Sequence, residues 1–79
     1  MYKTILDYYE EVLPILTEKQ KTKGFLAMDG DGEIYWFPSA PTLDYTTIWY
    51  SENSEYICTN QDLACYYQYS LYKIQEELK

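Results

Sequence analysis

Residues 24–38, which read GFLAMDGDGEIYWFP, decide the fold of this chain. They contain two short runs rich in aromatic and aliphatic side chains, GFLAMD at 24–29 and EIYWF at 33–37. Gly30-Asp31-Gly32 separates the runs, and glycine next to aspartate is typical of the turn in a β-hairpin. The stretch therefore predicts two antiparallel strands, one at 24–29 and one at 33–37.

Downstream of this hairpin, two prolines in the sequence PSAPT at 38–42 are expected to stop strand pairing and form a connector. Residues 45–51, which read YTTIWYS, alternate as strand residues do, and ENS at 52–54 is typical of a turn. Residues 55–58, EYIC, would then form the returning strand. We expect a second hairpin built from these two strands.

Helical periodicity lies on both sides of the predicted strands. Apolar residues recur at helical spacing over 2–20, with acids early and lysines late, which suits the helix dipole. Pro14 lies inside this segment and predicts a kink or break near residue 13. A second amphipathic helix is predicted over 60–78, with Thr59 as its N-cap. The apolar stripe of this helix comprises Leu63, Tyr67, Leu71, Ile74 and Leu78.

The element order, helix, four strands and helix, predicts the fold class. We expect a single acidic α+β domain over 1–79, in which N-terminal and C-terminal helices flank one face of an antiparallel four-stranded sheet. The chain has 79 residues, too few for a second core. A domain of this size also leaves little core from which to build a deep pocket.

Charge is the most informative part of the composition. Asp and Glu total 13 against six lysines, with no arginine and no histidine, so the net charge is -7. This charge opposes direct binding to nucleic acid or to an anionic membrane and favours a basic protein surface. From Gly24 through Tyr72 the sequence has no basic residue, and it has seven acidic ones there, which are candidate partner-binding residues: Asp29, Asp31, Glu33, Asp44, Glu52, Glu55 and Asp62.

Tyrosine is the second outlier, with 11 residues in the chain. The helical and strand patterns cannot bury all of them, since neighbouring strand residues face opposite sides of a sheet. Exposed tyrosines anchor protein interfaces at low entropic cost. We therefore expect neutral anchors for a protein partner among Tyr45, Tyr50 and Tyr56.

No motif predicts catalysis or a cofactor. DGDGE at 29–33 places carboxylates at the first, third and fifth positions of a calcium loop, but Ile34 and Ala40 stand where that loop needs glycine and glutamate. Cys58 and Cys65 have no activating base near them in the sequence, and we expect both to be reduced, small buried residues. The prediction is a protein that is not an enzyme and has no catalytic residue, metal site or cofactor.

In size, acidity, aromatic content and lack of a catalytic motif, the chain resembles the small acidic inhibitors that bacteriophages deploy against host restriction and CRISPR nucleases. The resemblance implies host defence evasion by a nucleic-acid mimic, an anti-CRISPR or anti-restriction protein. Such an inhibitor would block the basic nucleic-acid-binding surface of a partner enzyme, a nuclease or its complex. No motif of any one family is matched residue by residue.

Two other hypotheses stay open at this point. The chain is also consistent with an immunity protein that neutralises a basic toxin, or with a structural or assembly module, such as a homodimer that buries its surplus aromatic side chains. The N-terminal segment carries acids where a signal peptide is apolar, and no apolar run is long enough to span a bilayer. We expect a cytoplasmic protein, in the host cytoplasm if it is encoded by a phage.

Overall fold

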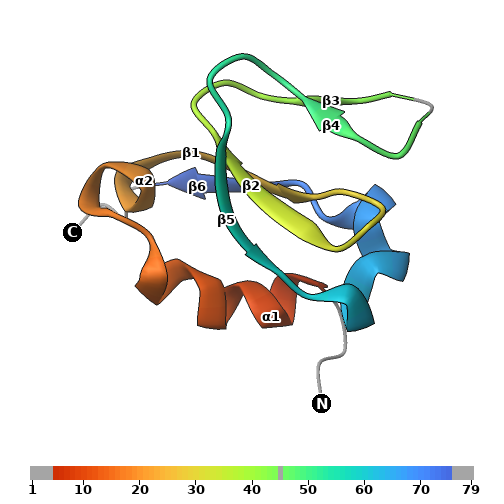
Figure 1. Cartoon of the computed structure of the whole chain (residues 1–79). Helices are drawn as coiled ribbons and strands as arrows, with labels where there is room; N and C mark the ends of the chain where they lie inside the picture. Colours follow the sequence, from red (N-terminus) through yellow and green to blue (C-terminus); the bar gives the residue numbers. More distant parts are fainter. Residues whose placement is uncertain (1–4, 45, 76–79) are drawn as a thin grey trace.

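The hairpin predicted over residues 24–38 forms the centre of the computed structural model (Figure 1). Strand β1 (Lys23–Met28) pairs antiparallel with β2 (Glu33–Phe37), with Phe25 opposite Phe37. The amide of Asp29 donates to the carbonyl of Glu33 at 2.9 Å and so closes the turn. This prediction is confirmed. The structure describes residues 5–44 and 46–75.

A four-stranded antiparallel sheet is built around this hairpin, in the order β5-β2-β1-β6. Strand β5 (Glu55–Thr59) pairs with β2, and β6 (Tyr72–Gln75) pairs with β1. The mixed α+β class and the antiparallel four-stranded sheet are thus confirmed. Two predicted features, the second hairpin and the C-terminal helix, differ from the structure.

The predicted second hairpin is wrong in its pairing. β4 (Trp49–Tyr50) pairs with β3 (Thr42–Leu43), and together they form a separate two-stranded ribbon, while β5 joins the main sheet. The turn inside this ribbon is local. The Asp44 carboxylate accepts the amide of Thr46 at 2.8 Å and that of Ile48 at 3.2 Å. Such an aspartate turn ends the extended run that the sequence pattern suggested.

The predicted C-terminal helix over 60–78 is also wrong. A 3-10 helix, η2 (Gln61–Tyr69), occupies its first half, and the chain then runs along the outer edge of β1 as β6. Pairing with β6 gives the backbone N–H and C=O groups along that edge of β1 hydrogen-bond partners, whereas a helix in this place would leave them unpaired. Leu71, expected on a buried stripe, is accordingly 40% exposed. Leu78 and the rest of 76–79 lie outside the described residues.

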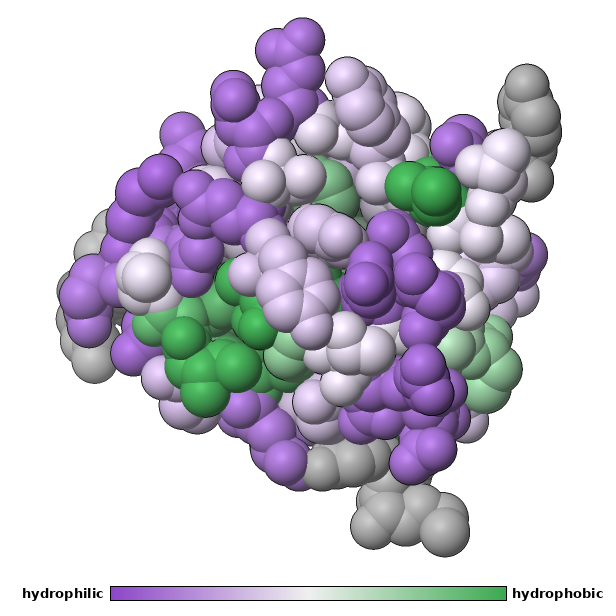
Figure 2. All heavy atoms as spheres, in the orientation of Figure 1, coloured by the Kyte–Doolittle hydropathy of each residue, from purple (hydrophilic) through white to green (hydrophobic). Residues whose placement is uncertain are grey.

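The break predicted at Pro14 is confirmed. Helix α1 (Ile5–Val12) ends two residues before it, and the short η1 (Leu13–Ile15) and α2 (Glu18–Thr22) follow. Thr17 and Gln20 form a reciprocal capping box at the start of α2. Figure 2 shows a hydrophobic patch over this helical segment, where Ile15 is 61% exposed.

The two faces of the main sheet are covered by different elements. On one face α1 and η2 pack against the sheet, and this core comprises Ile5, Tyr9, Val12, Leu16, Leu26, Met28, Ile34, Trp36, Leu63 and Ile74. On the other face lies the β3–β4 ribbon (Figure 1). No helix among the described residues is long and apolar enough to cross a membrane.

Both cysteines are free thiols, as expected. Cys58 is half-buried, with its Sγ 3.9 Å from the Tyr8 hydroxyl, and burial raises the pKa of this thiol. Cys65 is exposed, so its predicted burial is wrong. The reason is its place in η2, a 3-10 helix in which only Leu63 is buried.

Candidate functional site

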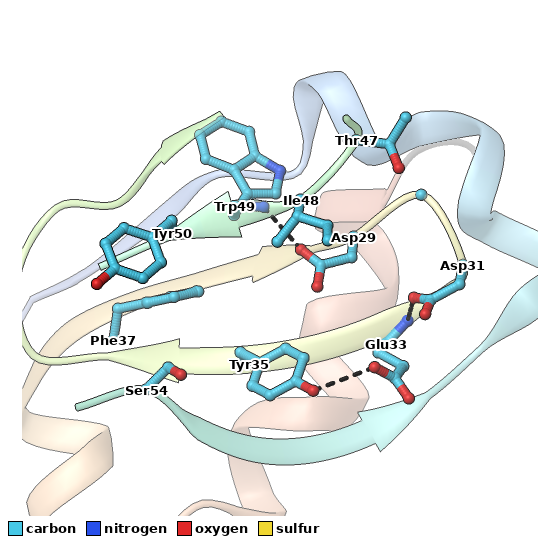
Figure 3. A pocket seen from close by; sticks show the side chains of 11 residues that line it. Asp29, Asp31, Glu33, Tyr35, Phe37, Thr47, Ile48, Trp49, Tyr50 and Ser54 are labelled. Carbon is cyan, nitrogen blue, oxygen red and sulfur yellow. Dashed lines mark hydrogen bonds between the residues drawn. The ribbon is translucent and has the colours of Figure 1, made fainter. Parts of the chain in front are cut away.

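A pocket of about 380 Å³ lies between the main sheet and the β3–β4 ribbon (Figure 3). Residues from the β1–β2 turn, from β2 and from the segment 47–50 line it, together with Ser54. A chain of this length was expected to leave little room for such a pocket. The ribbon provides it, because a second layer over the outer face of the sheet encloses space without enlarging the core.

Among the described residues, three hydrogen bonds attach the ribbon to the rest of the fold. The amide of Trp49 donates to Oδ1 of Asp29 at 2.8 Å, and the amide of Gly30 donates to the carbonyl of Thr47 at 2.8 Å. The indole of Trp49 donates to the carbonyl of Tyr67 in η2 at 2.9 Å. The end of the ribbon next to the pocket is thereby fixed to the β1–β2 turn and to η2.

The carboxylates of Asp29, Asp31 and Glu33 meet at one end of the pocket, with one oxygen of each within 4.8 Å of the others. The tight turn brings them together: Oδ1 of Asp31 accepts the amide of Glu33 at 3.0 Å. Gly32 makes this turn with a φ of +91°, and a Cβ there would lie 2.9 Å from the carbonyl oxygen of Asn60. Glycine is therefore required at this position.

Asp29 is the buried member of this acidic cluster (Asp29, Asp31 and Glu33), with 7% of its surface exposed. Burial raises its pKa, and the charges of Asp31, Glu33 and Asp44 raise it further, while the hydrogen bond from Trp49 acts in the opposite direction. Within the described part of the chain, Oδ1 accepts that one bond and Oδ2 accepts none. The second oxygen of this largely buried residue thus faces the pocket without a described protein donor (Figure 3).

Aromatic rings form the rest of the wall. Glu33, Tyr35 and Phe37 alternate along β2 and therefore share the face that the ribbon covers. The ring centroids of Tyr35 and Phe37 are 6.3 Å apart, and Tyr50 adds a third ring (Figure 3). The Tyr35 hydroxyl donates to Glu33 at 3.1 Å, and burial first, then Glu33, raises the pKa of this phenol. It therefore remains a neutral donor.

Sequence reasoning missed most of this wall. Tyr35, Phe37, Ile48 and Trp49 line the pocket but were not among the candidate residues. The period-two pattern of Glu33, Tyr35 and Phe37 in the confirmed strand was a usable signal, since it places two rings on the same face as an acid. Nothing local indicated Ile48 or Trp49, because the ribbon reaches the sheet through contacts distant in sequence.

The structure brings together part of the predicted acidic set. Asp29, Asp31 and Glu33 line the pocket, and Asp44 is close enough to influence Asp29. Asp44 also has a structural role, since hydrogen bonds from the Thr46 hydroxyl, the Thr46 amide and the Ile48 amide lower its pKa. The role of this carboxylate is first to form the ribbon turn.

Glu55 lies elsewhere, on β5 opposite Trp36. It accepts a hydrogen bond from the Gln20 side chain at 2.6 Å and pairs with Lys19 at 3.7 Å. Glu52 and Asp62 are exposed and do not line the pocket. These three residues are therefore not part of the cluster.

Of the three candidate tyrosines, Tyr50 lines the pocket and is 64% exposed. Tyr56 is also exposed and packs edge-on against Tyr35 with ring centroids 5.7 Å apart, so it extends the aromatic wall outwards. Tyr45 lies outside the described residues.

Comparison of the chain with models of protein families, with curated proteins and with solved structures gave no match. The described lining residues of the pocket supply carboxylates, hydroxyl groups and aromatic rings, and no thiol or amine. Carboxylates with aromatic walls are the groups that bind cations in proteins.

Proposed function

We propose that this chain binds a basic, nucleic-acid-binding surface of another protein, such as a nuclease or its complex, and excludes nucleic acid from it by competition. The observation that carries the proposal is the acidic cluster, three carboxylates within 4.8 Å of one another at a pocket that contains no described basic residue. Both described ion pairs lie elsewhere, at Lys19–Glu55 and Lys21–Glu18.

Such a cluster suits the mechanism because nucleic acid is itself a dense row of negative charges, about one per 1.7 Å of duplex axis. Lysines and arginines arranged for phosphates accept a fixed group of carboxylates in the same place. The aromatic wall adds neutral contact area next to the charges, which interface anchors require. The acids determine where the partner binds, and Tyr50 and Tyr56 contribute contact area.

The proposal is tested by capture from a nuclease-treated bacterial lysate, with bound proteins identified by mass spectrometry. The cluster variant is Asp31→Asn with Glu33→Gln. The matched control is Glu52→Gln with Asp62→Asn, which removes the same charge outside the pocket. We expect wild type and control to capture the same nucleic-acid-binding protein, and the cluster variant to lose most of it.

The captured protein is then mixed with a DNA or RNA duplex and the wild-type chain. The duplex and the chain should displace each other, because they compete for the same basic groups. Simultaneous binding of both would contradict competition. Equal loss of capture by the two double variants would show that total charge, not the cluster, drives the association, and failure of wild type to capture any nucleic-acid-binding protein would remove the proposal.

A further inference from the structure

We propose that the pocket is a receptor for one lysine side chain of the partner, an inference that rests on the proposed function and names the group that the site binds. The cluster would hold the ammonium group, and the rings of Tyr35, Phe37 and Tyr50 would cover the stem. Figure 3 shows this division, with the carboxylates at one end of the pocket and Phe37 and Tyr50 at the other.

The geometry of the carboxylates fits an ammonium nitrogen. The three oxygens lie within 4.8 Å of one another, so one nitrogen can stand about 2.8 Å from all of them at once. That is the usual length of a charge-assisted hydrogen bond between nitrogen and oxygen. A lysine ammonium has three donors, one for each carboxylate. The oxygens of Asp29, Asp31 and Glu33 thus match it in number and in spacing.

Asp29 differs from Asp31 and Glu33 because it is the buried residue of the cluster. Only 7% of the surface of this residue is exposed, and its Oδ2 accepts no hydrogen bond within the described part of the chain. Oδ2 keeps some surface open to the pocket, so a ligand can donate a hydrogen bond to it there. A cation at this point would satisfy the oxygen and relieve the repulsion from Asp31 and Glu33.

The other wall distinguishes lysine from competing cations. Arginine prefers a coplanar, bidentate carboxylate, whereas lysine carries a compact charge on a four-carbon stem. Calcium takes six to eight oxygen ligands and magnesium an octahedral set, and rings supply none of these. The Phe37 and Tyr50 rings suit methylene groups, and the Tyr35 hydroxyl donates to Glu33, which places a third ring beside the carboxylates.

The experiment is a nuclear magnetic resonance titration of the full ¹⁵N-labelled chain at low salt with lysine capped as its N-acetyl methylamide. The reporters are the backbone amides of Trp49 and Glu33, which donate to cluster carboxylates. Parallel titrations use capped Nε-acetyl-lysine, which has the same stem without the charge, capped arginine, and calcium or magnesium chloride. Glu33→Gln and Tyr50→Ala are the test variants, and Glu52→Gln is the charge-matched control.

We expect saturable shifts with capped lysine, and binding at least about tenfold weaker with the acetylated form. Glu33→Gln should weaken binding about fivefold or more, Tyr50→Ala about two- to fivefold, and Glu52→Gln less than about twofold. Dispersed spectra of each variant confirm folding. Equal binding of the acetylated form, equal effects of the two glutamine variants, tighter binding of arginine, or displacement of lysine by a divalent cation at lower concentration would each overturn the inference.

The titration separates this inference from the proposed function because the probe requires no partner. If the lysate yields a nucleic-acid-binding protein through the cluster, but capped lysine leaves the reporter amides of Trp49 and Glu33 unshifted, the lysine receptor is wrong and the function stands. If capped lysine saturates the pocket and no nucleic-acid-binding protein is captured, the function is wrong and the receptor serves another lysine-bearing protein.

Discussion

At the scale of single residues, Asp29 combines a structural and a functional role. It accepts the amide of Trp49, which holds the ribbon, and it forms the buried base of the pocket. Because burial and neighbouring carboxylates raise its pKa above the ordinary value of 3.8, the native state binds a proton more readily than the unfolded chain does. Stability therefore falls as the pH rises from that ordinary value through the higher native one.

Asp29→Asn tests this pH dependence of stability, since asparagine retains an oxygen for the Trp49 amide and carries no charge. We expect the variant to be more stable than wild type at pH 7, with the difference shrinking as the pH is lowered towards about 3.5. Urea unfolding across this range measures it, with the exposed Asp62→Asn as control. A variant less stable than wild type at pH 7 would show that the charged hydrogen bond to Trp49 outweighs the burial cost.

At the scale of elements, Ser70 joins three parts of the fold. Its hydroxyl accepts the amide of Met28 at 2.8 Å and donates to the carbonyl of Tyr67 at 2.7 Å. Its own carbonyl accepts the Tyr9 hydroxyl at 2.8 Å. The Ser70 side chain thus gives the Met28 amide of β1 the acceptor that a strand partner would otherwise supply, two residues before β6 begins.

Ser70→Ala should destabilise the protein by about 1–3 kcal/mol, because the fully buried Met28 amide would lose its acceptor. Urea unfolding measures the loss, and hydrogen exchange should show the largest fall in protection in β6 and at Met28. Ser39→Ala, at an exposed position, is the matched control and should change stability by less than about 0.5 kcal/mol. Equal protection of β6 in both variants would contradict this role of Ser70.

The same elements show how far sequence could predict the structure. The central hairpin was predictable because its turn and both strands are local and adjacent. The ribbon was not, because Asp44 ends the extended run through its own side chain and the Trp49 amide pairs with Asp29, 20 positions away. The C-terminal segment fits both the helical and the strand periodicity, since Tyr72 and Ile74 also alternate in β6. Only pairing with the open edge of β1 favours the strand over the helix.

The part of the candidate site that lies in the predicted hairpin was predictable, and the part that depends on the ribbon was not. Asp29, Asp31 and Glu33 are close in sequence and lie in a predicted turn, so their association followed from the local pattern. Glu55 was placed with them by charge alone, and its contacts with Gln20 and Lys19 instead stabilise the helical side of the fold. Local periodicity places Glu33, Tyr35 and Phe37 on one face of β2, but it does not predict the ribbon that encloses this face and forms the pocket.

At the scale of the whole molecule, the distribution of charge opposes folding. The net charge is -7, and three carboxylates lie within 4.8 Å of one another in the native state. Like charges held close together destabilise the compact state, and dissolved salt screens them over about 10 Å at 0.1 M. A cation bound at the cluster would offset part of this cost.

Raising sodium chloride from about 20 to 300 mM should therefore stabilise the wild-type chain, as measured by its thermal midpoint. Asp31→Asn with Glu33→Gln should be more stable than wild type at low salt and should lose most of this salt response. Glu52→Gln with Asp62→Asn removes the same charge from outside the pocket and should retain most of it. If both pairs reduce the response equally, repulsion is spread over the whole surface. If only the cluster pair does, the unfavourable charge is concentrated in the pocket, where a bound lysine would neutralise it.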